Sequence, residues 1–134
     1  MSIEKDAVAF HADGYNCCQC VLKACKKYYP ELDDNMLARI ASGFGGGVCC
    51  GEICGAVTGG VMAIGLSNEF MEGDRETVLE SKKKIKALIQ SYNQDFKNNF
   101  DSLLCSDLKG GKFSCDELIA YGALSAEKMI ENNK

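Results

Sequence analysis

The sequence predicts an all-α protein, a compact single-domain bundle of about five or six helices with a glycine-rich loop. Apolar residues recur at helical spacing along most of the chain, and no segment alternates apolar and polar residues over the length of a strand. A single proline leaves long stretches free of helix breakers. The 134 residues, 46% hydrophobic and 25% charged, fit one domain, a cysteine-rich helical unit over residues 1–134.

The first two helices are marked by their ends. The apolar spacing that starts at Ile3 predicts a helix that stops at Gly14. Asn16 is a good capping residue, so we expect a second helix over residues 17–28, which ends before Pro30.

Four further segments follow in order. Asp33 caps a third helix, and a glycine-rich loop covers residues 43–51. An apolar helix is expected at residues 54–66 and a long amphipathic helix at residues 74–100. Ser114 opens the last helix through a capping box.

Charge and terminal sequence limit the partners. The net charge is −4, and Glu80 lies four residues before Lys84 in the one dense basic run, which indicates a solvated helix face and no nucleic-acid partner. The first residues resemble no signal peptide, and the segment 41–66 is too rich in glycine for a membrane span. We therefore expect a cytoplasmic protein with no membrane partner. An unknown redox protein is the expected partner, and the glycine-rich helix would allow a homodimer.

Cysteine is the outlier in the composition. In a chain of this size without an export signal, such thiols serve metal binding or catalysis more often than disulfide scaffolding. The chain contains nine of them: Cys17, Cys18, Cys20, Cys25, Cys49, Cys50, Cys54, Cys105 and Cys115.

Three cysteines share a position at the start of a predicted helix. Cys17 follows the cap Asn16, Cys115 follows the cap Ser114, and Cys54 opens the apolar helix. A helix N-terminus offers free N–H groups and a positive partial charge, both of which lower a cysteine pKa and favour the thiolate. These positions predict sulfurs that act as nucleophiles or metal ligands.

Other motifs are less specific. Cys17 and Cys20 form a C-x-x-C pair without a surrounding βαβ pattern, and His11 is expected to be a surface or packing residue. The glycine loop does not match a P-loop, so its expected role is to let backbone N–H groups approach a bulky group such as cluster sulfurs. We assign this cofactor-approach role to six glycines: Gly45, Gly46, Gly47, Gly51, Gly55 and Gly59.

Three segments stand in a characteristic order: Gly14-Tyr-Asn-Cys17, Gly43-Phe-Gly-Gly-Gly47 and Gly51-Glu-Ile-Cys54-Gly-Ala-Val-Thr-Gly59, followed by Cys105 and Cys115. Together they resemble the C_GCAxxG_C_C family, whose members are described as redox-active on the basis of their cysteines. The resemblance runs from about Phe10 to Ala123. It implies a functional set of four thiols, Cys17, Cys54, Cys105 and Cys115, and related domains in split-Soret cytochromes imply an iron–sulfur centre.

Three functions remain open at this point. The first is an iron–sulfur protein for electron transfer or sensing, with the four thiols as metal ligands. The second is a metal-free thiol–disulfide protein in which Cys17 or Cys54 is the catalytic, attacking thiol. The third is a structural module that binds zinc or another soft metal. The five cysteines outside the family set could act as alternative ligands or resolving thiols.

Overall fold

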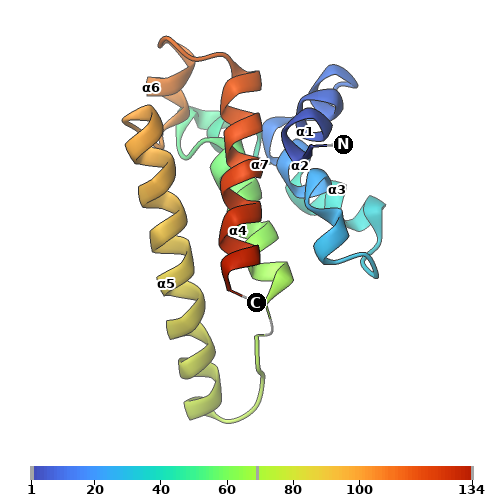
Figure 1. The fold of residues 1–134 in the computed structure, drawn as a ribbon, viewed down its shortest axis with the longest axis vertical. Coiled ribbons are helices and arrows are strands. Elements are labelled where there is room, and N and C mark those ends of the chain that lie inside the picture. The colour runs from blue at the N-terminus through green and yellow to red at the C-terminus, as the bar shows by residue number, and fades with distance from the viewer. Residues whose placement is uncertain (1, 69, 134) are drawn as a thin grey trace.

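The computed structural model describes residues 2–68 and 70–133, and these residues form helices without a β-sheet (Figure 1). The predicted all-α fold is confirmed. The described residues contain six helices of eight or more residues: α1 (Ile3–Ala12), α2 (Cys17–Ala24), α3 (Asp34–Ala41), α4 (Gly55–Ser67), α5 (Arg75–Phe100) and α7 (Cys115–Asn132).

Side-chain caps set the starts of five of these helices, all except α4, and the sequence predicts three of the caps, at Asn16, Asp33 and Ser114. The Asn16 side chain accepts a hydrogen bond from the Gln19 N–H at 2.9 Å, and the Asn16 N–H donates to the Gln19 side chain at 3.0 Å. At the starts of α3, α5 and α7 the equivalent bond is accepted by Asp33, Asp74 and Ser114. Local capping therefore fixes where α2 and α7 begin, and with them the positions of their first residues.

Three short elements differ from the predicted ones. The second helix is shorter than expected: α2 ends at Ala24, and the 3₁₀ turn η1 (Lys26–Tyr28) follows because Tyr29 turns inward and is fully buried. Cys105 lies in a short helix, α6 (Cys105–Lys109), which the sequence analysis did not predict. The glycine-rich loop contains a wide turn, η2 (Gly47–Gly51).

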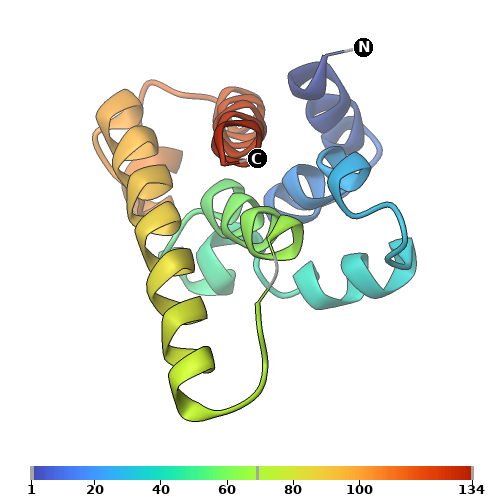
Figure 2. The ribbon, with the colours of Figure 1, turned by 60° about the horizontal axis from the view of Figure 1, so that its bottom comes forward.

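Helix α4 is the centre of the core, and it packs against α2, α5 and α7 (Figures 1 and 2). Val57 and Ile64 of α4 are buried, which explains why this helix is apolar on every side. Tyr92 of α5 is also buried, and its hydroxyl donates to the carbonyl oxygens of Ala56 at 3.2 Å and Gly122 at 2.9 Å. One side chain thus ties α5 to both α4 and α7.

The N-terminal helices cover the other side of this core. Helix α1 packs against α7 and α2, whereas α3 contacts α2 and lies farther from the centre (Figure 2). Across residues 2–68 and 70–133, every helix is too short or too polar to serve as a membrane span.

Candidate functional site

One cavity of about 240 Å³ brings together cysteines from the starts of four helices. Cys17 is the first residue of α2, Cys115 is the first residue of α7, and Cys54 is the cap of α4. Cys105 is the first residue of α6. The helix-start position was predicted for three of them, but not for Cys105, because Leu104 before it gives no side-chain capping signal.

A short antiparallel bridge joins the segments that precede α4 and α6. The Cys54 N–H donates to the Leu103 carbonyl oxygen at 2.8 Å, and the Cys105 N–H donates to the Glu52 carbonyl oxygen at 2.7 Å. These two bonds hold the two cysteine backbones in a fixed register, although they lie on different helices. The spacing of Cys54 and Cys105 is therefore set by the fold before any ligand binds.

The turn that precedes this bridge has an unusual backbone. Residues 46–49 have φ angles from 59° to 65°, in the left-handed region, and Val48 is β-branched. A left-handed conformation costs a non-glycine residue about 1–2 kcal/mol. A Cβ on Gly47 would lie 2.8 Å from the Cβ of Cys105 and 2.5 Å from the carbonyl oxygen of Glu52. The turn thus places bare backbone directly against Cys105.

Asn16 anchors the start of α2 at the cavity wall. Its Nδ2 donates to the carbonyl oxygens of Ala41 at 3.3 Å and Ser42 at 3.2 Å, which joins α2 to the end of α3. Gly45 packs closely on the same side chain, since a Cβ there would lie 2.7 Å from the Cβ of Asn16. Cys17, the next residue, is held in place by these contacts.

The six glycines predicted to approach a cofactor divide into two groups. Gly46 lines the cavity. In the same loop, Gly45 and Gly47 make close contacts with neighbouring residues, whereas a Cβ on Gly51 would lie 3.4 Å from the Cβ of Ser106, an ordinary van der Waals distance. Gly55 and Gly59 instead bring α4 against α2. A Cβ on Gly55 would lie 3.1 Å from the Cβ of Cys17, and a Cβ on Gly59 would lie 2.6 Å from the carbonyl oxygen of Cys18. These two glycines serve helix packing around the site.

The pKa expected for Cys54 is wrong in direction. Its position at the start of α4 does supply N–H groups, from Ala56 and Val57, which lower the pKa. Burial outweighs them and raises the pKa of Cys54 to about 11, with a further increase from Cys17 and Cys105. Without a metal, Cys54 is therefore a protonated thiol at neutral pH. The effect of Cys17 and Cys105 on Cys54 places these thiols within electrostatic range of it.

The other five cysteines lie outside the cavity lining and fall into two classes. Cys49 and Cys50 are exposed on η2. The Cys20 thiol donates to the Tyr15 carbonyl oxygen at 3.5 Å, so it is not directed at Cys17, its partner in the C-x-x-C pair. Burial raises the pKa to about 11 or 12 in three of them, Cys18, Cys20 and Cys25.

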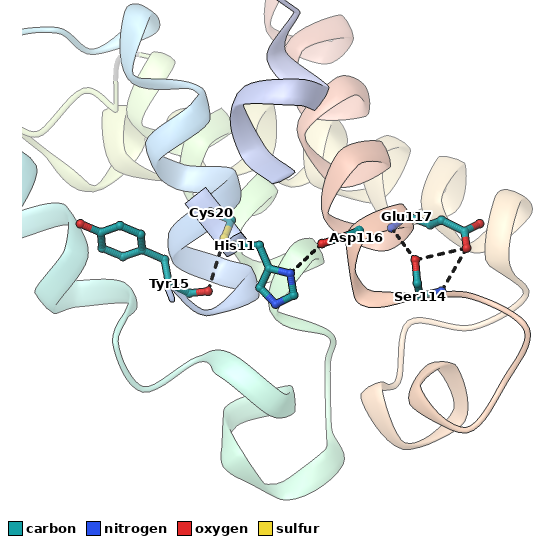
Figure 3. A network of polar contacts seen from close by, with 6 residues as sticks. All are labelled: His11, Tyr15, Cys20, Ser114, Asp116 and Glu117. Atoms are coloured by element: carbon teal, nitrogen blue, oxygen red, sulfur yellow. Dashed lines mark hydrogen bonds and ion pairs between the residues drawn. The ribbon is translucent and has the colours of Figure 1, made fainter. Parts of the chain in front are cut away.

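His11 is a site residue that the sequence analysis missed. It lines the same cavity, and its Nδ1 lies 2.7 Å from Oδ1 of Asp116, the residue after Cys115 (Figure 3). The side chain is 37% exposed and helps to pack α1 against α7, which agrees with the expectation of a surface or packing residue. The two partners are 105 residues apart, so no local pattern could have indicated the contact.

The four thiols line one cavity without being grouped around a single point. Within the described parts of the chain, no three His, Cys, Asp or Glu side chains are grouped so that they could hold a metal ion. Four thiols nevertheless line one cavity, together with the apolar side chains of Leu108 and Leu118. Thiols on separate walls can each bind a different metal atom of an iron–sulfur cluster, and an apolar lining limits access of water.

Comparison with known proteins identifies the family. A family model described as "Putative redox-active protein (C_GCAxxG_C_C)" matches residues 15–129. No curated protein and no solved structure gives a significant match. The family match covers most of the chain and includes all four cysteines of the cavity. The chain therefore belongs to the C_GCAxxG_C_C family.

Proposed function

We propose that the cavity binds an iron–sulfur cluster, and that the protein uses it for electron transfer or sensing. The observation that carries this proposal is the convergence of four thiols from four helix starts on one cavity of about 240 Å³. A cluster bound there would supply one-electron redox chemistry. The ligands would be Cys17, Cys54, Cys105 and Cys115.

The protein's own groups favour bound thiolates. Each of the four cysteines lies at a helix N-terminus, where free N–H groups and the helix dipole stabilise negative charge. At Cys54 the N–H groups of Ala56 and Val57 supply this effect directly. Such N–H groups raise the potential of a cluster by stabilising its reduced, more negative form.

Two observations bear on the alternatives. A structural zinc site needs four donors around one point, and the described residues show no such group. A thiol–disulfide protein needs a thiolate for attack, and burial, which raises the pKa of Cys54 to about 11, disfavours Cys54 for that role and leaves Cys17 as the candidate attacking thiol. Metal binding replaces the proton of a thiol, so a raised pKa is compatible with a ligand.

The test is metal and sulfide analysis of the protein prepared without oxygen. We expect iron and acid-labile sulfide in equal amounts, with a brown colour, after purification or after reconstitution with ferrous iron and sulfide. Zinc is measured on the same sample, and circular dichroism confirms that the chain is folded.

Three results would each overturn the proposal. Folded protein that takes up neither iron nor sulfide contradicts it outright. Stoichiometric zinc in place of iron indicates a structural metal site. A metal-free protein with a reversible two-electron couple indicates thiol–disulfide chemistry.

A further inference from the structure

The sequence contains a single histidine, and the fold places it on the wall of the four-cysteine cavity. His11 belongs to α1, which packs against α7. Its Nδ1 lies 2.7 Å from Oδ1 of Asp116, and the ring is held between the two helices (Figure 3). The side chain of His11 remains about one-third exposed, at 37%.

This contact determines which ring nitrogen is available. A carboxylate oxygen only accepts hydrogen bonds, so the Nδ1–H of His11 is the donor to Asp116. In the neutral ring, Nε2 then carries the free lone pair. Within residues 2–68 and 70–133, Nε2 has no hydrogen-bond partner. A histidine that binds a metal through one nitrogen and donates the other N–H to a carboxylate is the common arrangement in metalloproteins.

We propose that His11 is a metal-binding residue of this cavity, whose Nε2 can take the ligand position of Cys115. The proposal rests on the proposed cluster. Asp116 is the residue after Cys115, so the hydrogen bond holds the imidazole beside the turn of α7 that carries this thiol. His11 and Cys115 both line the cavity, and Asp116 is the positioning residue.

The alternative explanation is a purely structural ion pair between α1 and α7. The two explanations differ in what the nitrogen contacts. A structural pair leaves the cluster unchanged, whereas a ligand gives the cluster a nitrogen that spectroscopy detects. Replacing a thiolate by an imidazole also raises the reduction potential.

The experiment uses protein without an affinity tag, labelled with ¹⁵N-histidine, so that His11 is the one labelled residue. Wild type and the Cys115→Ser variant are reconstituted with iron and sulfide, reduced and examined by pulsed electron paramagnetic resonance. We expect the variant to keep its iron and to show hyperfine coupling from a directly bonded ¹⁵N, with a higher potential than wild type. Adding Asp116→Ala to this variant should weaken iron binding about 10- to 100-fold.

The outcomes separate this inference from the proposed function. If wild type takes up iron but Cys115→Ser loses it as completely as Cys54→Ser does, His11 is not a ligand. Iron that is retained in Cys115→Ser without ¹⁵N coupling overturns the inference as well. If wild type itself takes up no iron, the proposed function and this inference fail together.

Discussion

Replacing Gly47 by alanine tests whether the bare backbone of η2 sets the position of Cys105. Gly46 provides a matched control, because both glycines have nearly the same φ, 63° and 65°, in the same turn. A Cβ on Gly46 would meet nothing within 4 Å. A Cβ on Gly47 would lie 2.5 Å from the carbonyl oxygen of Glu52 and 2.8 Å from the Cβ of Cys105.

The magnitudes follow from these distances. Alanine in a left-handed conformation costs about 1–2 kcal/mol, and this cost applies to both variants. Overpacking adds about 1–3 kcal/mol to Gly47→Ala alone, because most of the contacted atoms belong to the backbone and cannot rotate away. We therefore expect a loss of about 1–2 kcal/mol for Gly46→Ala and about 2–5 kcal/mol for Gly47→Ala.

The assay is urea unfolding of the metal-free, reduced protein, followed by circular dichroism. Iron uptake is then measured on both variants under conditions in which they are folded. Gly47→Ala should take up less iron, because relief of its contacts displaces the Glu52–Cys105 hydrogen bond. Equal stability of the two variants, to within about 0.5 kcal/mol, would refute the reasoning.

Three more predictions concern thiols and caps. Iodoacetamide at ~pH 8 should modify the exposed Cys49 and Cys50 in the native metal-free protein. Mass spectrometry should find the buried thiols with raised pKa values, Cys18, Cys20 and Cys25, unmodified. Rapid labelling of these three would contradict their burial. Burial raises the pKa of Cys25 from 9.0 to about 12, so above pH 9 the unfolded state loses a proton that the folded state keeps. This contribution to stability is complete below pH 9 and is lost as the pH rises toward 12. The urea midpoint should therefore fall less steeply with pH in Cys25→Ala than in wild type, and an equal slope of midpoint against pH would contradict this assignment. Asn16→Ala should cost about 1 kcal/mol through loss of the α2 cap and should also reduce iron uptake. The control is Asp33→Ala, at the start of α3 and outside the cavity lining. It should lower the free energy of unfolding by a similar amount without changing iron uptake. Equal iron uptake by both variants would show that the cap does not position Cys17.

Local signals in the sequence were sufficient to predict the six longer helices, but not the short helix α6 or the early end of α2 at Ala24. Asn16, Asp33 and Ser114 each cap the helix predicted from them, because a cap depends on residues three or four positions apart. Asp74 caps the helix that was predicted from its amphipathic pattern. The same signals placed Cys17 and Cys115 correctly at helix starts. The selection of four cysteines from nine came from the family resemblance, since spacing alone did not distinguish them.

The remaining features of the site depend on contacts between distant segments. The bridge that aligns Cys54 with Cys105 joins segments about fifty residues apart, and the pair His11–Asp116 joins the two ends of the chain. The left-handed turn at Val48 opposes the local preference of a β-branched residue, so propensity argues against it. The pKa of Cys54 was misjudged because a helix N-terminus is visible in the sequence, whereas burial is not.

The proposed function requires that the cavity thiols, and not the exposed pair Cys49 and Cys50 on η2, hold the metal group. The most direct test is iron and sulfide content after anaerobic reconstitution of four single variants: Cys54→Ser, Cys105→Ser, Cys49→Ser and Cys50→Ser. All four are checked for folding by circular dichroism. We predict that the first two lose most of their iron, whereas the last two match wild type. Full iron content in Cys54→Ser and Cys105→Ser, with loss in the η2 variants, would contradict the account.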